Sequence, residues 1–172
     1  MMPQRIMDHS AAGGARHLEG HSELNSSDPE NAFGPLASVE DSELLRRFET
    51  QCIRRDEWTH TEHCRVAYLL IQKHDWAGAV HCMRECIIKL NNAQGVPNSD
   101  TRGYHETVTI AWLRLIAAAM ERNTVTRSSQ EFLQSNPHLL DKTTLAQYFS
   151  QHLLSSVLAR QFFVHPDLIP LP

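Results

Sequence analysis

The sequence contains no apolar run long enough to cross a membrane, and it has no excess of positive charge. Its longest apolar stretch, around Leu115–Met120, falls far short of the roughly 20 residues that a membrane-spanning helix needs. The formal net charge of −4 at pH 7 argues against nucleic acid or an anionic membrane as partner, because either would require a basic surface. Residues 1–20 lack the apolar core of a signal peptide, so we expect a cytoplasmic protein.

Cysteine is scarce, and several catalytic motifs are absent. Two of the four cysteines, Cys82 and Cys86, fall one turn apart on a single predicted helix, which is poor geometry for a disulfide, so we expect reduced thiols. The chain has no glycine-rich phosphate loop, no G-x-S-x-G and no H-E-x-x-H motif. These absences remove the usual sequence signatures of nucleotide binding, serine hydrolysis and zinc peptidase activity.

The patterns that are present predict one all-α domain over residues 38–172, a helical bundle with a four-helix up-down core, preceded by a disordered leader over residues 1–37. The leader is rich in Gly, Ser, Asn, His and Glu and shows no helical or strand periodicity. Ser38 and Asp75 are predicted N-caps, and Thr59 with Glu62 forms a predicted capping box. Apolar residues at helical spacing predict helices over 39–54, 60–74, 76–95, 104–122, 128–136, 143–154 and 156–163.

Histidine is unusually abundant, with 11 in 172 residues, and two clusters open two of the predicted helices. They are residues 58–63 (WTHTEH) and residues 103–107 (GYHET). Helices joined by short loops pack antiparallel, so the second and fourth helices should be parallel, with their first turns at the same end of the bundle. We therefore expect the two clusters to meet there.

Such a meeting predicts a chemical site. Three imidazoles, from His60, His63 and His105, suit a divalent transition metal, with Glu106 as fourth ligand or base. Without a metal, His105 and Glu106 suit proton transfer. The structural alternative makes His63 the partner of Trp58 in a hydrophobic staple and makes His105 and Glu106 ordinary polar residues of a first turn.

Three further residues complete the predicted site. Tyr104 and Trp58 would form walls of the pocket, and Arg160 would pair with a substrate carboxylate. Cys64 next to a histidine could serve as a nucleophile, but it follows the histidine stripe by one position, so we expect its thiol to point elsewhere.

The chain also resembles a group of small all-helical bacterial proteins of unassigned function. The resemblance covers roughly residues 55–172 and rests on W-x-H-x-x-H at 58–63, G-Y-H-E-T-x-T at 103–109 and P-D-L-x-P-L-P at 166–172. His165 departs from the pattern, which has an acidic residue there. The resemblance implies a single folded unit and carries no reaction with it.

The last residues, 164–172, are predicted to be extended because their prolines exclude helix. Phe162, Phe163, Leu168, Ile169 and Leu171 would be costly to expose together, so the tail should fold back over the bundle. The sequence leaves two functions open. One is an enzyme or binding protein that takes a small polar or anionic metabolite in a histidine-rich pocket. The other is a non-catalytic helical interaction module whose histidines are structural.

Overall fold

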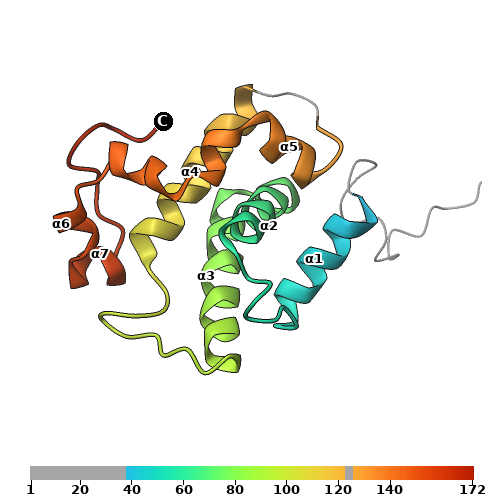
Figure 1. Cartoon of the computed structure of the whole chain (residues 1–172), viewed down its shortest axis with the longest axis horizontal. Coiled ribbons are helices and arrows are strands. Elements are labelled where there is room, and N and C mark those ends of the chain that lie inside the picture. The colour runs from blue at the N-terminus through green and yellow to red at the C-terminus, as the bar shows by residue number, and fades with distance from the viewer. Residues whose placement is uncertain (1–37, 123–125) are drawn as a thin grey trace, which may run out of the picture.

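Helix is the only regular secondary structure in the parts of the chain that the computed structural model describes, residues 38–122 and 126–172 (Figure 1). The all-α prediction is therefore confirmed, while the predicted leader over 1–37 lies outside the described residues. None of the described helices is both long and apolar enough to cross a membrane. The elements in order are α1 (Val39–Glu49), α2 (His60–Lys73), α3 (Trp76–Ala93), α4 (Glu106–Arg122), α5 (Ser129–Ser135), the 3₁₀ helices η3 (Pro137–Leu140) and η4 (Lys142–Gln147), α6 (Gln151–Leu154) and α7 (Val157–Gln161).

Helix α2 is the central helix of the bundle. Every residue from Val66 to Leu70 is buried, so this part of the helix is covered on all sides. It packs against α1, α3, α4, α5 and η3. Figure 1 shows α1 on one side of the α2–α3 pair and α4 on the other, with α7 beyond α4. The start of α2 is therefore surrounded by elements from widely separated parts of the sequence.

Two helix starts follow the predicted caps. The side chain of Ser38 accepts a hydrogen bond from a first-turn N–H at 3.1 Å, and Asp75 does the same at 2.8 Å. The predicted capping box of α2 is wrong. Its Thr59 hydroxyl donates to the carboxylate of Glu62 and makes no bond to the main chain of the helix.

Two predicted helices are shorter than their apolar spacing suggests. Helix α1 ends at Glu49 instead of residue 54, because Gln51 adopts a left-handed backbone conformation with φ of 56°. The helix predicted over 143–154 is divided into η4 and α6. Ser150 begins the second piece by capping it, its hydroxyl accepting from the N–H of Leu153 at 3.1 Å. A local backbone conformation sets the first boundary, and a side-chain cap sets the second.

Asn98 fixes the long loop that connects α3 to α4. Its Oδ1 accepts hydrogen bonds from the main-chain N–H of Tyr104 and from the side-chain amide of Asn91, both at 2.9 Å. Gly103 precedes Tyr104 with φ of +82°, and a Cβ there would lie 2.4 Å from the carbonyl oxygen of Pro97. Glycine is required at this position, and the loop consequently enters α4 at a fixed orientation.

The C-terminal tail returns to the bundle through hydrogen bonds. The carboxylate of Asp167 accepts from the N–H and hydroxyl of Ser150 at 2.8 and 2.6 Å. On α4, the hydroxyl of Thr107 donates to the carbonyl of Phe162 at 2.9 Å and accepts from the N–H of Val164 at 3.0 Å. The tail is thereby tied to α4 and to the start of α6.

The tail buries fewer apolar side chains than the sequence predicts. Phe163 and Leu171 pack against the core. Phe162, Leu168 and Ile169 keep 60%, 54% and 49% of their surface exposed. The expectation of burial is therefore wrong for these three, because the hydrogen bonds of the tail hold it at the edge of the bundle and leave these side chains on its outer face.

Candidate functional site

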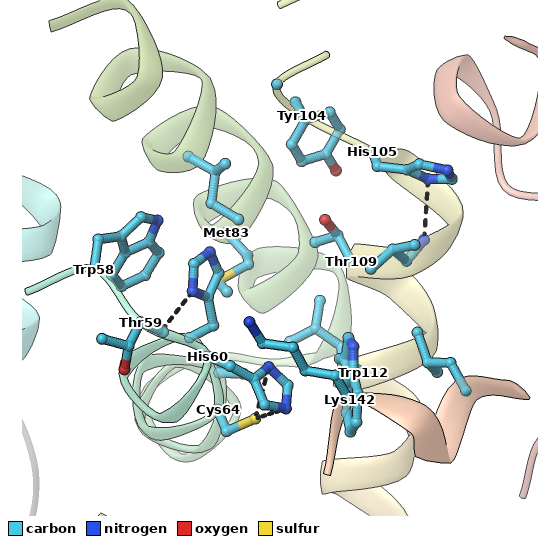
Figure 2. Close-up of a pocket in the computed structure, with 17 residues that line it drawn as sticks. Trp58, Thr59, His60, Cys64, Met83, Tyr104, His105, Thr109, Trp112 and Lys142 are labelled. Carbon is cyan, nitrogen blue, oxygen red and sulfur yellow. Dashed lines mark hydrogen bonds between the residues drawn. The ribbon is translucent and has the colours of Figure 1, made fainter. Parts of the chain in front are cut away.

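A pocket of about 580 Å³ lies where the first turns of α2 and α4 meet, in front of α3 (Figure 2). Figure 2 looks along α2 and shows α4 crossing that direction. We call this cavity the histidine pocket. Its lining residues are Trp58, Ala67, Met83, Ile87, Val108, Trp112, Leu113 and Leu145 as apolar walls, and Thr59, His60, His63, Cys64, Gly103, Tyr104, His105, Thr109 and Lys142. The three predicted histidines line it together with Trp58 and Tyr104, whereas Glu106 and Arg160 do not.

His60 is fixed by a main-chain carbonyl from η3. Its Nε2 lies 2.9 Å from the carbonyl oxygen of Leu139, and because a carbonyl only accepts, this nitrogen carries the proton. The ring also meets Trp112 edge to face, with centroids 4.6 Å apart. Burial lowers the pKa of His60 below its ordinary value, so the imidazole is neutral at pH 7.

His63 is held in the same manner by its own helix start. Its Nδ1 donates to the carbonyl of Thr59 at 2.7 Å, which leaves Nε2 as a bare acceptor. The ring packs against Trp58 in a tilted arrangement with centroids 3.8 Å apart, which is the staple contact of the structural alternative. Burial lowers the pKa of His63 to about 4. This histidine is therefore a neutral hydrogen-bond acceptor at physiological pH.

His105 has both ring nitrogens engaged with the main chain. Its Nε2 donates to the carbonyl of Leu154 at 2.9 Å, and its Nδ1 accepts from the N–H of Val108 at 3.3 Å. Burial, and to a smaller degree the charge of Arg160, lowers the pKa of His105. The residue links the first turn of α4 to the end of α6.

These bonds do not assemble the metal site predicted from His60, His63 and His105. Within residues 38–122 and 126–172, no three His, Cys, Asp or Glu side chains are arranged to hold a metal ion. A metal ligand needs a free lone pair directed at a common point, and His105 has none. The geometry accordingly supports neutral polar groups in a pocket and not a metal centre.

Glu106, the predicted base, turns away from the histidine pocket. Its carboxylate accepts two hydrogen bonds from Arg84, at 3.0 and 2.5 Å, and one from the Tyr104 hydroxyl at 2.7 Å. Burial raises the pKa of Glu106, but the bonds from Arg84 and Tyr104 outweigh it, so the pKa lies below its ordinary value. One guanidinium nitrogen of Arg160 donates hydrogen bonds to the carbonyls of Gly103 and Tyr104, at 3.2 and 3.0 Å. Both residues border a separate cleft on the other side of Tyr104.

Cys64 faces the histidines, contrary to the sequence expectation. Its Sγ lies 3.6 Å from Nε2 of His60 and 3.4 Å from the carbonyl oxygen of Leu139. The two residues are four positions apart, so they share one face of α2. Burial raises the pKa of the Cys64 thiol to about 12, with a smaller contribution from Glu62. The thiol stays protonated at neutral pH and is a poor nucleophile.

The sequence interpretation missed Lys142 as a member of the site. This residue begins η4 and lines the pocket opposite α2, with its side chain extending from η4 toward the α2 side chains in Figure 2. No local signal marks it, because it comes near His60 only through the fold, some 80 residues along the chain. Leu145 and Leu139 reach the pocket region by the same route.

Comparison of the chain with protein-family models, with curated proteins and with solved structures found no match. The site is therefore interpreted from its own geometry.

Proposed function

We propose that this chain binds a small organic molecule in the histidine pocket. The volume of about 580 Å³ falls within the range of small-molecule sites. The walls are mainly aromatic and aliphatic, with a few polar groups among them, which is the composition typical of such sites.

The observation that carries the proposal is the fixed orientation of the pocket's histidines. His60, His63 and His105 each hold their proton on a nitrogen bonded to a main-chain carbonyl. Their tautomers and ring positions are consequently set before any ligand arrives. Polar groups that are already ordered cost little further entropy on binding, so this arrangement favours ligand affinity.

The same geometry favours binding over acid–base or nucleophilic chemistry. His63 has its pKa lowered to about 4 and so has no proton to give from Nε2 at neutral pH. Cys64 remains a thiol, since burial raises its pKa to about 12. Glu106 is bonded to Arg84 outside the pocket. None of the three is poised to act on a molecule bound between the histidines.

The three tryptophans give a direct test. Trp58 and Trp112 line the pocket, whereas Trp76 lies 42% exposed at the start of α3 and does not. In ¹⁵N-labelled protein, we expect naphthalene-sized aromatic fragments to shift the indole N–H signals of Trp58 and Trp112 and to leave that of Trp76 in place. Single Trp→Phe variants assign the three signals.

A pocket-filling variant supplies the matched control. Val108 lines the pocket, and Glu121 is exposed near the end of the same helix. Val108→Trp should abolish the shifts and Glu121→Trp should preserve them. Fragments that leave all three wild-type indole signals unmoved, or that bind Val108→Trp as well as wild type, would contradict the proposed function.

A further inference from the structure

The residues that line the histidine pocket contain one permanently charged group and no carboxylate. That group is the ammonium of Lys142. Its nearest acidic neighbour in sequence, Asp141, uses its carboxylate on the N–H and hydroxyl of Thr143, at 2.8 and 2.7 Å. The side chain of Lys142 makes no ion pair or hydrogen bond with any residue of 38–122 or 126–172. A positive charge that no described residue pairs with therefore lies beside the cavity.

The charge of Lys142 reaches the histidines. It lowers the pKa of both His60 and His63, after the larger effect of burial. Both imidazoles stay neutral. They therefore neither offset the positive charge of Lys142 nor compete with it for an anion. A negatively charged group between Lys142 and α2 would be attracted to the ammonium, whose effect exceeds the opposing effects of Asp141 at His60 and of Glu62 at His63.

The remaining free donors of the pocket also suit an anion. The indole N–H groups of Trp58 and Trp112 have no hydrogen-bond partner within the described parts of the chain, although both rings line the cavity. The phenol of Tyr104, by contrast, is committed to Glu106. Two indole donors and an ammonium surround a space whose other walls, such as Met83 and Leu113, are apolar.

From this arrangement we infer that the ligand is an organic monoanion, a carboxylate attached to a flat apolar body, with its carboxylate on Lys142 and its body between Trp58 and Trp112. One ammonium neutralises one carboxylate, whereas a phosphate dianion would leave a charge unpaired in an apolar cavity. This inference rests on the proposed function and specifies the class of ligand for the same pocket.

Three probes with the same naphthalene body test it: 2-naphthoate, its isosteric amide 2-naphthamide, and the cation 2-naphthylmethylamine, each titrated by calorimetry into the full chain at pH 7. The naphthoate should bind about tenfold more tightly than the neutral amide. A hydrogen bond between charged groups contributes more to the free energy of binding than a neutral one, by an amount that corresponds to about tenfold in affinity. The cationic amine should bind most weakly. Added salt should weaken naphthoate binding and leave the amide unchanged.

Variants of Lys142 assign the anchor. Lys142→Gln should remove the preference for naphthoate over naphthamide, and Lys142→Arg should retain it. Lys89→Gln is the matched control, because Lys89 is exposed on α3 and pairs with Glu85 at 3.6 Å outside the pocket. An undiminished preference in Lys142→Gln would overturn the role of Lys142.

The outcomes separate this inference from the proposed function. Equal binding of the three probes, with the indole signals of Trp58 and Trp112 shifted, would overturn the anionic class and leave the pocket as a binding site. No binding of any probe, with both indole signals unmoved, would count against the pocket itself.

Discussion

His60 donates its Nε2 hydrogen to the carbonyl of Leu139, a residue 79 positions later in the chain, across 2.9 Å. His105 does the same to Leu154, 49 positions later, at the same distance. The two histidines that open the clusters thus bind the C-terminal third of the chain to the first turns of α2 and α4. Burial lowers the pKa of both, so the folded state favours their neutral form.

Stability should fall as the pH decreases from about 6.5 to about 4. The folded protein lowers the pKa of His60, His63 and His105, so the unfolded chain binds more protons in this window and is stabilised relative to the folded state. For His63, whose pKa falls from 6.5 to about 4, the loss approaches about 3 kcal/mol below pH 4. Urea unfolding at a series of pH values measures this fall in the free energy of unfolding.

Two histidine variants separate the contribution of His63 to this pH dependence from that of carboxylates, which also take up protons as the pH falls. His63→Phe keeps a ring in contact with Trp58 and removes the titrating group, so the stability of this variant should depend less on pH between 6.5 and 4. His138→Gln changes an exposed histidine and should leave the profile as in wild type. An identical pH profile for wild type and His63→Phe would contradict the assignment.

Gly103→Ala should destabilise the protein much more than Gly95→Ala. Both glycines have positive φ, at +82° and +68°, which costs an L-residue about 1–2 kcal/mol. Only at Gly103 would the new Cβ also clash, lying 2.4 Å from the carbonyl oxygen of Pro97, while nothing lies within 4 Å of it at Gly95. Thermal unfolding of the two variants compares their losses of stability. Equal losses would show that the loop around Asn98 moves to make room for the new Cβ.

Asp41→Asn should cost about 3 kcal/mol, the order expected when one partner of a buried ion pair is removed. Asp41 is 1% exposed and accepts from Arg65 at 3.1 Å and from the N–H of Ser129 at 2.8 Å, joining α1, α2 and α5. Glu43→Gln is the control on the same helix, because the Glu43–Arg46 pair is exposed and should contribute nothing measurable. Chemical denaturation of both variants decides whether the buried network stabilises the bundle.

Local sequence patterns predicted the helices and several of their ends. Ser38 and Asp75 cap as predicted, since an N-cap depends on a side chain and an N–H only three residues away. The predicted capping box at Thr59 is wrong, because the Thr59 hydroxyl donates to the carboxylate of Glu62. This partner is as close in the sequence as the main-chain N–H that a cap would bind. The early end of α1 at Glu49 could not be predicted, because the left-handed residue that follows it is Gln51 and not a glycine.

The candidate site was only partly predictable for a different reason. His60 and His63 share a face of one helix, and their placement follows from spacing alone. The orientation of Glu106 depends on Arg84, a residue of another helix. The place of Lys142 in the pocket depends on the packing of η3 on α2, because η4 follows η3. Such contacts are set by the packing of distant segments, which periodicity does not encode.

Thr107→Val should release the tail from α4 while the rest of the fold persists. Thr107 is fully buried, and its hydroxyl both donates to Phe162 and accepts from Val164, so valine of similar shape leaves two main-chain groups without partners at a cost of about 1–3 kcal/mol. Hydrogen exchange at the Val164 amide should accelerate by about tenfold or more. The amide of Leu168 should keep its protection, because its bond to the Tyr148 carbonyl is supported by Asp167 and Ser150. Thr101→Val, on the exposed loop, should change neither amide. Unchanged exchange at Val164 in Thr107→Val would mean that the Thr107 hydroxyl does not hold the tail.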